Sequence, residues 1–250
     1  MLLHDLTGDA HTWDEFAEDA ALYYRVVAPD LRGHGQSGHA EDGYGLDLFT
    51  ADVRALVQTL DLHTFDLVGH SLGALIAIRF AAERPELVNR LVLVDGGPGM
   101  DTKAARDSMA DSFSQHLTFE SEEEANAWYK ERNPALDFHG LEQRVKYGVK
   151  QKLTGRWVFR HDPALHRLLA DGLYGLQEEE QELWGMLAAI RCSILVLRGQ
   201  ESLLLSSDAA HCMVATASNA TLMEIPVAGH SIPSEAPEQF RGAVLGFLLE

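Results

Sequence analysis

Basic residues and long hydrophobic runs are scarce in this chain of 250 residues. Lys and Arg number 20 against 38 Asp and Glu, which gives a net charge of −18. This charge argues against nucleic acid and anionic membranes as partners, because both repel a strongly negative protein. No apolar run approaches the ~20 residues of a membrane span, and no basic segment precedes an apolar stretch at Met1. We therefore expect a soluble cytoplasmic protein.

Cysteine is also rare, with Cys192 and Cys212 as the two examples. Two cysteines suit a reducing compartment, where they remain free thiols. No cluster of His, Cys and carboxylate residues has the spacing of metal ligands, so we expect neither a metal nor a cofactor. The apolar fraction of 46% and the charged fraction of 23% are those of an ordinary globular protein. The length fits one domain, or one domain with an insertion.

Short apolar runs alternate with amphipathic stretches of helical length, which predicts an α/β fold with a mostly parallel sheet flanked by helices. A helix is expected around Phe49, Val53 and Val57, a buried one over Leu72–Arg84 before Pro85, and a last one over Pro237–Leu249. The predicted strands are Met1–His4, Tyr24–Ala28, Phe65–Val68, Arg90–Val94, Ile194–Leu197 and Thr221–Ile225.

The pattern changes between Gly99 and about Leu187, where charged helical segments dominate. SEEEANAWYKER begins with a capping box of Ser121 and Glu124. HGLEQRVKYGVKQKL and DPALHRLLADGL also read as helices, and the short run RWVFR around Trp157 is strand-like. We interpret residues 100–187 as a helical cap insertion, and residues 1–99 and 188–250 as the core.

The segment that carries chemistry is Gly69-His70-Ser71-Leu72-Gly73, between the apolar run FDLV and the buried helix. This is the G-x-S-x-G nucleophile elbow in the strand–turn–helix context that it requires. The small residues two positions either side of Ser71 are needed because strand and helix nearly touch there. Ser71 is therefore the candidate nucleophile.

Three longer motifs make the chain resemble the α/β-hydrolase superfamily over nearly its whole length. They are VVAPDLRGHGQSG (26–38), LVGHSLGALIAIRFAAERPELVNRLVLVD (67–95) and VAGHSIPSEAPEQF (227–240). The first is similar to a loop of esterases, C–C bond hydrolases and cofactor-free perhydrolases. The helical insertion lies where that family places its cap. The resemblance implies the α/β-hydrolase fold and a Ser…acid…His order along the chain.

A serine hydroxyl needs a general base, and the resemblance assigns that role to His230 in VAGHS. His4 and His34 occupy positions that usually support loops. His70, inside the elbow, could line the pocket or pack against its neighbours. The cap histidines are expected on the surface; they are His116, His139, His161 and His166.

The acid that orients the base departs from the family's commonest pattern. The two usual places after the strand around Ile194–Leu197 hold Ser202 and Leu203. Asp95 ends the preceding strand run, and some superfamily members take their acid from that place. We favour Asp95 over the alternatives: Glu201 as the acid, or Asp95 as a turn former only. Asp208 is expected to be an N-cap.

The two backbone donors to the oxyanion are expected from Leu6 and Leu72. Family members carry His-Gly before the first of these donors, but Asp5 stands here in place of the glycine. A carboxylate near the developing negative charge would oppose its stabilisation, where one lost donor costs about 3–4 kcal/mol. Asp5 therefore raises the question of whether the oxyanion hole is intact.

The sequence also begins inside the first predicted strand, where family chains carry a further β-hairpin of ~20 residues. About four residues of this strand remain, or ~13 Å. We expect a start upstream of Met1, which a comparison of melting temperatures between this chain and an extended one would test.

Together these residues predict a serine hydrolase that cleaves a small carboxylic ester through an acyl-enzyme. Hydrolysis of a C–C bond or an amide would use the same residues, and perhydrolase activity is a further alternative. A reading from another class is a non-catalytic, hydrolase-like protein that binds a ligand under its cap. Substrate identity and oligomeric state stay open.

Overall fold

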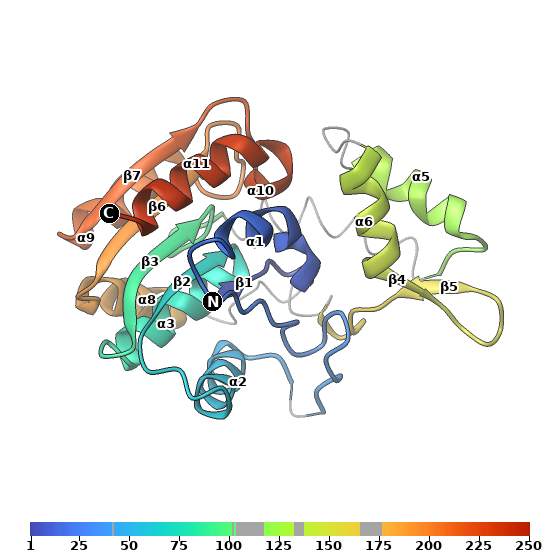
Figure 1. Ribbon diagram of the computed structural model, residues 1–250, viewed down its shortest axis with the longest axis horizontal. Coiled ribbons are helices and arrows are strands. Elements are labelled where there is room, and N and C mark those ends of the chain that lie inside the picture. Colours follow the sequence, from blue (N-terminus) through green and yellow to red (C-terminus); the bar gives the residue numbers. More distant parts are fainter. Residues whose placement is uncertain (42, 102, 104–117, 133–137, 166–176) are drawn as a thin grey trace.

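A computed structural model of the chain shows a central sheet of five parallel strands in the order β1-β2-β3-β6-β7 (Figure 1). The structure describes residues 1–41, 43–101, 103, 118–132, 138–165 and 177–250. The strands are β1 (Leu2–Leu3), β2 (Phe65–His70), β3 (Val88–Val94), β6 (Ser193–Gly199) and β7 (Ala220–Ile225). The predicted α/β fold with a mostly parallel sheet is confirmed.

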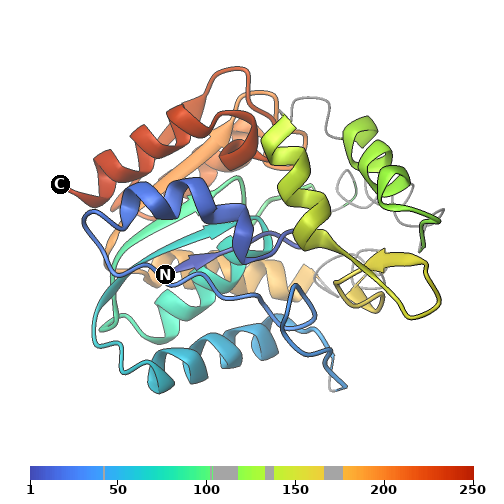
Figure 2. The same cartoon turned by 45° about the vertical axis from the view of Figure 1, so that its right-hand side comes forward.

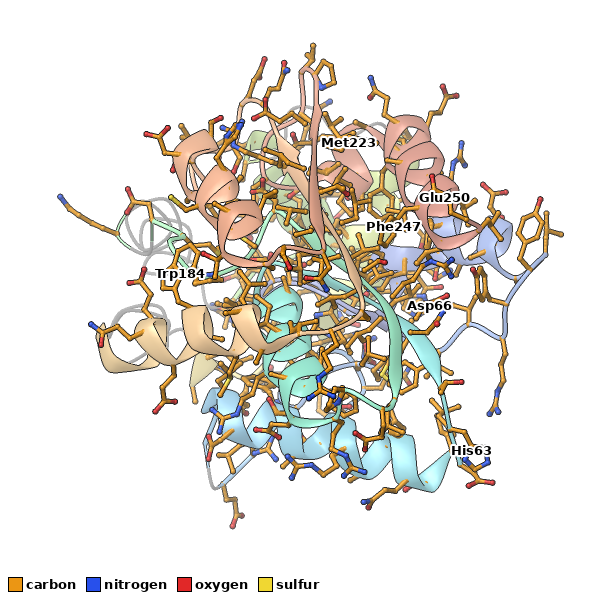
Figure 3. The ribbon with its side chains drawn as sticks, turned by 90° about the vertical axis from the view of Figure 1, so that its left-hand side faces the viewer. His63, Asp66, Trp184, Met223, Phe247 and Glu250 are labelled. Atoms are coloured by element: carbon orange, nitrogen blue, oxygen red, sulfur yellow. The ribbon has the colours of Figure 1, made fainter. Side chains whose placement is uncertain are left out.

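Helices cover both faces of this sheet, so its central strands are buried on both sides. One face is covered by α1 (Asp14–Ala20) and α11 (Pro237–Leu248), and the other by α2 (Leu46–Thr59), α3 (Leu72–Glu83), α8 (Gln177–Ala189) and α9 (Ser207–Thr216). Phe247 on α11 and Trp184 on α8 lie on opposite sides of the strands (Figure 3). This double cover explains why the strands read as continuous apolar runs.

Five of the six predicted strands are present, and the sixth, Tyr24–Ala28, is not a strand. The run lies beside β1, and the Leu2 N–H donates to the Val27 carbonyl at 2.8 Å. Because β1 is two residues long, it offers too few backbone groups for a longer ladder.

The prediction that Asp208 caps a helix is also wrong. Ser206 is the N-cap of α9, and its hydroxyl accepts from the Ala209 N–H at 3.1 Å.

The insertion contains α5 (Glu122–Arg132), α6 (Phe138–Gly148) and an antiparallel pair of β4 (Val149–Gln151) and β5 (Trp157–Phe159). One half of the predicted capping box is present, since the Glu124 N–H donates to Ser121 Oγ at 3.2 Å. The Glu124 carboxylate accepts from the Glu120 N–H at 2.6 Å in place of the Ser121 N–H. The helix predicted over HGLEQRVKYGVKQKL ends at Gly148, because the following residues pair with β5. Most of DPALHRLLADGL lies outside the described residues.

Within the described residues the insertion has its own apolar cluster, and two of its contacts with the core lie near His11 and near Tyr44. The cluster comprises Phe119, Ala125, Tyr129, Leu141, Val145, Val149 and Phe159. The His11 ring of the 3-10 helix η1 (Ala10–Trp13) stacks on Tyr147 of α6 at 3.4 Å between centroids, and α6 lies beside η1 (Figure 2). At the second place, Tyr44 donates to the Asp162 carboxylate at 2.5 Å. The assignment of residues 100–187 as a separate cap stays a prediction.

His161 corrects the expectation that the cap histidines are surface residues. It is buried, and its ring stacks on Phe159 at 4.8 Å. The side chains of His116, His139 and His166 lie outside the described residues. None of the helices within the described ranges combines the length and hydropathy that a bilayer crossing requires.

Candidate active site

Ser71 occupies a sharp turn between β2 and α3. Its φ of 55° and ψ of −113° lie outside the regions that a serine ordinarily adopts. The turn is held because the Ser71 N–H donates to the Val94 carbonyl at 3.0 Å. A Cβ on Gly69 would lie 2.2 Å from the Gly73 carbonyl oxygen, so a side chain at Gly69 cannot be accommodated there. The elbow predicted from the sequence is therefore formed.

The two expected oxyanion donors belong to segments that meet at this elbow. Leu72 is the first residue of α3, and Leu6 is buried in the loop after β1. A Cβ on Gly73 would lie 2.2 Å from the Leu3 carbonyl oxygen, which shows how closely β1 approaches α3. The N–H groups at a helix N-terminus favour negative charge. The loop of Leu6 is itself held by His34, whose Nε2 donates to the Leu6 carbonyl at 2.7 Å.

Asp95 follows β3 directly and is fully buried. Its φ of 41° is in the left-handed region, which Asp tolerates better than most residues. Oδ1 accepts from the Gly199 N–H at 3.1 Å, and Oδ2 accepts from Ser202 Oγ at 2.5 Å. Oδ2 also accepts from His230 Nδ1 at 2.7 Å. Burying a carboxylate is costly unless its oxygens accept hydrogen bonds, and these three donors supply them.

His230 lies in the loop between β7 and the short helix α10 (Ile232–Glu235). With Nδ1 donating to Asp95, the lone pair of a neutral ring is on Nε2. The backbone carbonyl of His230 accepts from His70 Nε2 at 2.9 Å, and the two rings lie 4.8 Å apart. Glu235 holds the same loop, since its carboxylate accepts from the Gly229 N–H at 2.5 Å. The loop is therefore anchored on both sides of the imidazole.

The two candidate acids, Asp95 and Glu201, have different surroundings. Among the described residues, the carboxylate that bonds to His230 is that of Asp95. The Glu201 residue is exposed in the loop after β6, and its N–H donates to the Ala228 carbonyl. Ser202 lies where the superfamily resemblance would place the acid, and it bonds to Asp95, a contact that the sequence does not predict. The only signal in the sequence was the missing acid itself.

Asp5 points its carboxylate mainly toward Thr7. Oδ2 accepts from Thr7 Oγ1 at 2.7 Å and from the Thr7 N–H at 3.3 Å. Oδ1 makes no hydrogen bond within the described part of the chain, and it lies 4.0 Å from the equally unbonded His70 Nδ1. Burial raises the pKa of Asp5, but His70, Arg144 and the bonds from Thr7 outweigh it and hold the pKa below its usual value. The carboxylate is therefore fixed within the loop after β1.

Two buried histidines near the elbow are held in the neutral form. Burial lowers the pKa of His70 to about 4 and that of His4 to about 3. The bonds of His4 suit a neutral ring, because Nδ1 donates to the Asp5 carbonyl at 2.7 Å and Nε2 accepts from the Leu31 N–H at 2.9 Å. Both rings would protonate near pH 6.5 in the unfolded chain.

These lowered pKa values predict that acid destabilises the fold. Below pH 6.5 the unfolded chain binds more protons than the folded one, so stability is full above pH 6.5 and falls toward pH 4. The slope is about 1.4 kcal/mol per pH unit for each histidine. Urea unfolding at pH 7.5 and at pH 5.5 measures the loss. A His70→Gln variant should flatten the slope, whereas His63→Gln, at an exposed position, should not. Equal stability at the two pH values would contradict this assignment.

Within the described residues, no group of three or more His, Cys, Asp or Glu side chains could hold a metal ion. The carboxyl ends of the strands carry three candidate groups: a serine on a strained turn, an imidazole and a buried carboxylate. Asp95 bonds to His230, whereas within the described residues Ser71 Oγ makes no hydrogen bond to His230. The three groups belong to three different strand ends of one parallel sheet, where the carboxyl ends of the strands meet. Such a set can supply a nucleophile, a base and an orienting acid.

The chain is similar to a described protein family and to several known proteins. A family model described as "Alpha/beta hydrolase family" matches residues 1–243. An uncharacterized protein of Mycobacterium tuberculosis is 38% identical over 97 residues, which is 39% of this chain but 28% of that protein. An esterase of the same species is 28% identical over 99% of this chain and 82% of its own length.

Solved structures agree with the family match. The crystal structure of that esterase superposes with a TM-score of 0.83, over 100% of this chain and 83% of the esterase. The crystal structure of E-2-(acetamidomethylene)succinate hydrolase superposes with a TM-score of 0.90 at 24% identity, over 100% and 90% of the two chains. At that identity the second match shows the fold alone. The family model and the fold agree that this chain belongs to the α/β-hydrolase family.

Proposed function

We propose that the protein is a serine hydrolase that cleaves a small carboxylic ester, with Ser71, His230 and Asp95 as its triad. The observation that carries this proposal is the 2.7 Å bond from His230 Nδ1 to buried Asp95, whose neighbour Gly96 packs closely against Ser71 of the elbow. A carboxylate on Nδ1 fixes the tautomer whose Nε2 can take a proton from a serine hydroxyl.

The reaction follows from these roles. Ser71 Oγ attacks the ester carbonyl carbon while His230 Nε2 takes the hydroxyl proton, and the N–H groups of Leu6 and Leu72 donate to the oxyanion. The imidazolium then returns the proton to the leaving alcohol, which leaves an acyl group on Ser71. Water, deprotonated by His230, attacks the acyl carbon and releases the acid and the free serine. Asp5 does not oppose this scheme if its carboxylate stays bonded to Thr7.

The similarity to an esterase that covers nearly the whole chain supports an ester substrate. The same triad could cleave an amide or a C–C bond, and a protein that only binds a ligand would need none of these contacts.

Rapid-mixing kinetics with p-nitrophenyl acetate, and with p-nitroacetanilide as its amide counterpart, test the proposal. We expect a burst of p-nitrophenol equal to the enzyme concentration, because the acyl-enzyme forms faster than it hydrolyses. Turnover of the anilide should be at least about 100-fold slower, as the anilide is the poorer acyl donor. Faster cleavage of the anilide would favour an amidase, and no turnover of either compound would favour a binding protein.

A further inference from the structure

The loop after β6 presents one buried hydroxyl to the acid of the proposed triad. Ser202 is 7% exposed, and its Oγ donates to Asp95 Oδ2 at 2.5 Å. The residue has its own backbone anchor, since the Ser202 N–H donates to the Gly199 carbonyl at 3.0 Å. This hydroxyl lies where the superfamily resemblance would place the acid itself.

Two backbone N–H groups that also bond to Ser202 Oγ fix the direction of its hydrogen bond to Asp95. The N–H groups of Leu204 and Leu205 both donate to Ser202 Oγ, at 3.2 and 3.3 Å. A hydroxyl has two lone pairs and one hydrogen, so these two donors occupy the lone pairs. The hydrogen that remains is directed at the carboxylate. A hydrogen bond to an ionised acceptor is stronger than one between neutral groups.

Ser202 and His230 share one acceptor atom of Asp95. Oδ2 receives both the hydroxyl and the imidazole N–H, while Oδ1 receives the Gly199 N–H. The carboxylate is therefore clamped at both oxygens, and its plane cannot rotate about χ2 without breaking a bond. The Ser202 hydroxyl also reduces the negative charge density on Oδ2, the atom that accepts the hydrogen bond from His230.

We propose that Ser202 is a positioning residue that fixes the Asp95 carboxylate for its bond to His230. This inference rests on the proposed function, because it needs Asp95 to act as the triad acid. At the position where relatives usually carry the acid, this chain has Ser202, whose hydroxyl donates to Asp95 at the end of the neighbouring strand β3. It touches neither substrate nor nucleophile and acts through Asp95 alone.

Two substitutions at this position separate positioning from simple loop support. Ser202→Ala removes the donor, and Ser202→Cys keeps a side chain of similar shape with a weaker donor. Ser206→Ala is the matched control, because Ser206 Oγ also accepts a backbone N–H but makes its bond to Ala209 in α9. All four proteins are compared at one pH for their rate of acylation by a fluorophosphonate, for kcat and KM on p-nitrophenyl acetate, and for melting temperature.

The expected order of acylation rates is wild type, then Cys, then Ala, with Ser202→Ala slower by about tenfold or more. The loss should fall on kcat, with KM changed less than about twofold, because no contact to substrate is removed. The far-downfield proton resonance of His230 Nδ1 should move in Ser202→Ala and stay in place in Ser206→Ala. Ser206→Ala should lower the melting temperature without slowing acylation.

Equal acylation rates and an unmoved resonance in Ser202→Ala would overturn the inference, even if that variant melts earlier. If Ser202→Ala fails to fold, equal rates for wild type and Ser202→Cys would overturn it. Failure of the wild-type protein to acylate at Ser71 would instead overturn the proposed function. The two failures are therefore distinguishable in one set of measurements.

Discussion

An Asp95→Asn variant should keep its fold and lose about 10⁴-fold in kcat on an ester substrate. Asn suits this position, because it tolerates the left-handed φ of 41° at least as well as Asp does. The substitution changes no heavy-atom positions by design, so the loss would come from hydrogen placement alone.

The hydrogen bonds around Asp95 determine how the new amide must face. The Gly199 N–H is a fixed backbone donor to Oδ1, so the amide oxygen takes that side. The amide NH₂ then faces Ser202 and His230, where Oδ2 stood. It would donate to His230 Nδ1 and force the ring hydrogen onto Nε2. A ring with hydrogen on Nε2 cannot accept the proton of Ser71.

Steady-state kinetics on p-nitrophenyl acetate measure this effect, with melting temperature as a check on folding. Glu201→Gln is the control, because it neutralises the alternative acid, which lies exposed in the next loop. We expect wild-type kcat in that variant. A small effect of Asp95→Asn combined with a large effect of Glu201→Gln would show that the acid was wrongly assigned.

A Gly73→Ala variant should lose about 3–5 kcal/mol of stability, enough to unfold many domains. The added Cβ would lie 2.2 Å from the Leu3 carbonyl oxygen and 2.9 Å from that of His4. Both are backbone atoms of the first strand and its loop, so no rotamer change relieves the clash. The loop with Asp5 and Leu6 would have to move away from the elbow, and activity should fall with stability.

Gly242→Ala is the matched control for that substitution. Gly242 lies within α11, and a Cβ there meets nothing within 4 Å. Alanine is the better helix former, so this variant should gain up to about 1 kcal/mol. Urea unfolding of both variants measures the difference. A Gly73→Ala protein as stable as wild type would mean that strand and helix are not so close at the elbow.

The strand–elbow–helix core could be read from sequence because its signals are local. Apolar periodicity located five strands, and the G-x-S-x-G spacing located Ser71 within a turn that only small neighbours permit. The prediction of a strand over Tyr24–Ala28 was wrong because a strand needs a partner strand, and β1 is too short to be one. The prediction of Asp208 as an N-cap was wrong because Ser206, two residues earlier, caps the helix. Both residue types are common N-caps, so local composition alone does not choose between them.

The contacts among the site residues could be predicted only in part, because they join residues that are far apart in the sequence. Asp95 and His230 are 135 residues apart, and their bond depends on how the loops after β3 and β7 meet. The role proposed for Ser202 depends on the direction of one hydroxyl, which two backbone N–H groups fix. The orientation of Asp5 toward Thr7 also depends on side-chain geometry that no pattern of residue types encodes.

Fluorophosphonate labelling followed by intact mass and peptide mapping tests the central claim most directly. The reagent needs no knowledge of the substrate, but it does need an activated serine and a working oxyanion hole. We predict one added label per chain, on the peptide that contains Ser71, and none in Ser71→Ala. A folded wild-type protein that takes up no label, or takes it up at another residue, would contradict the account.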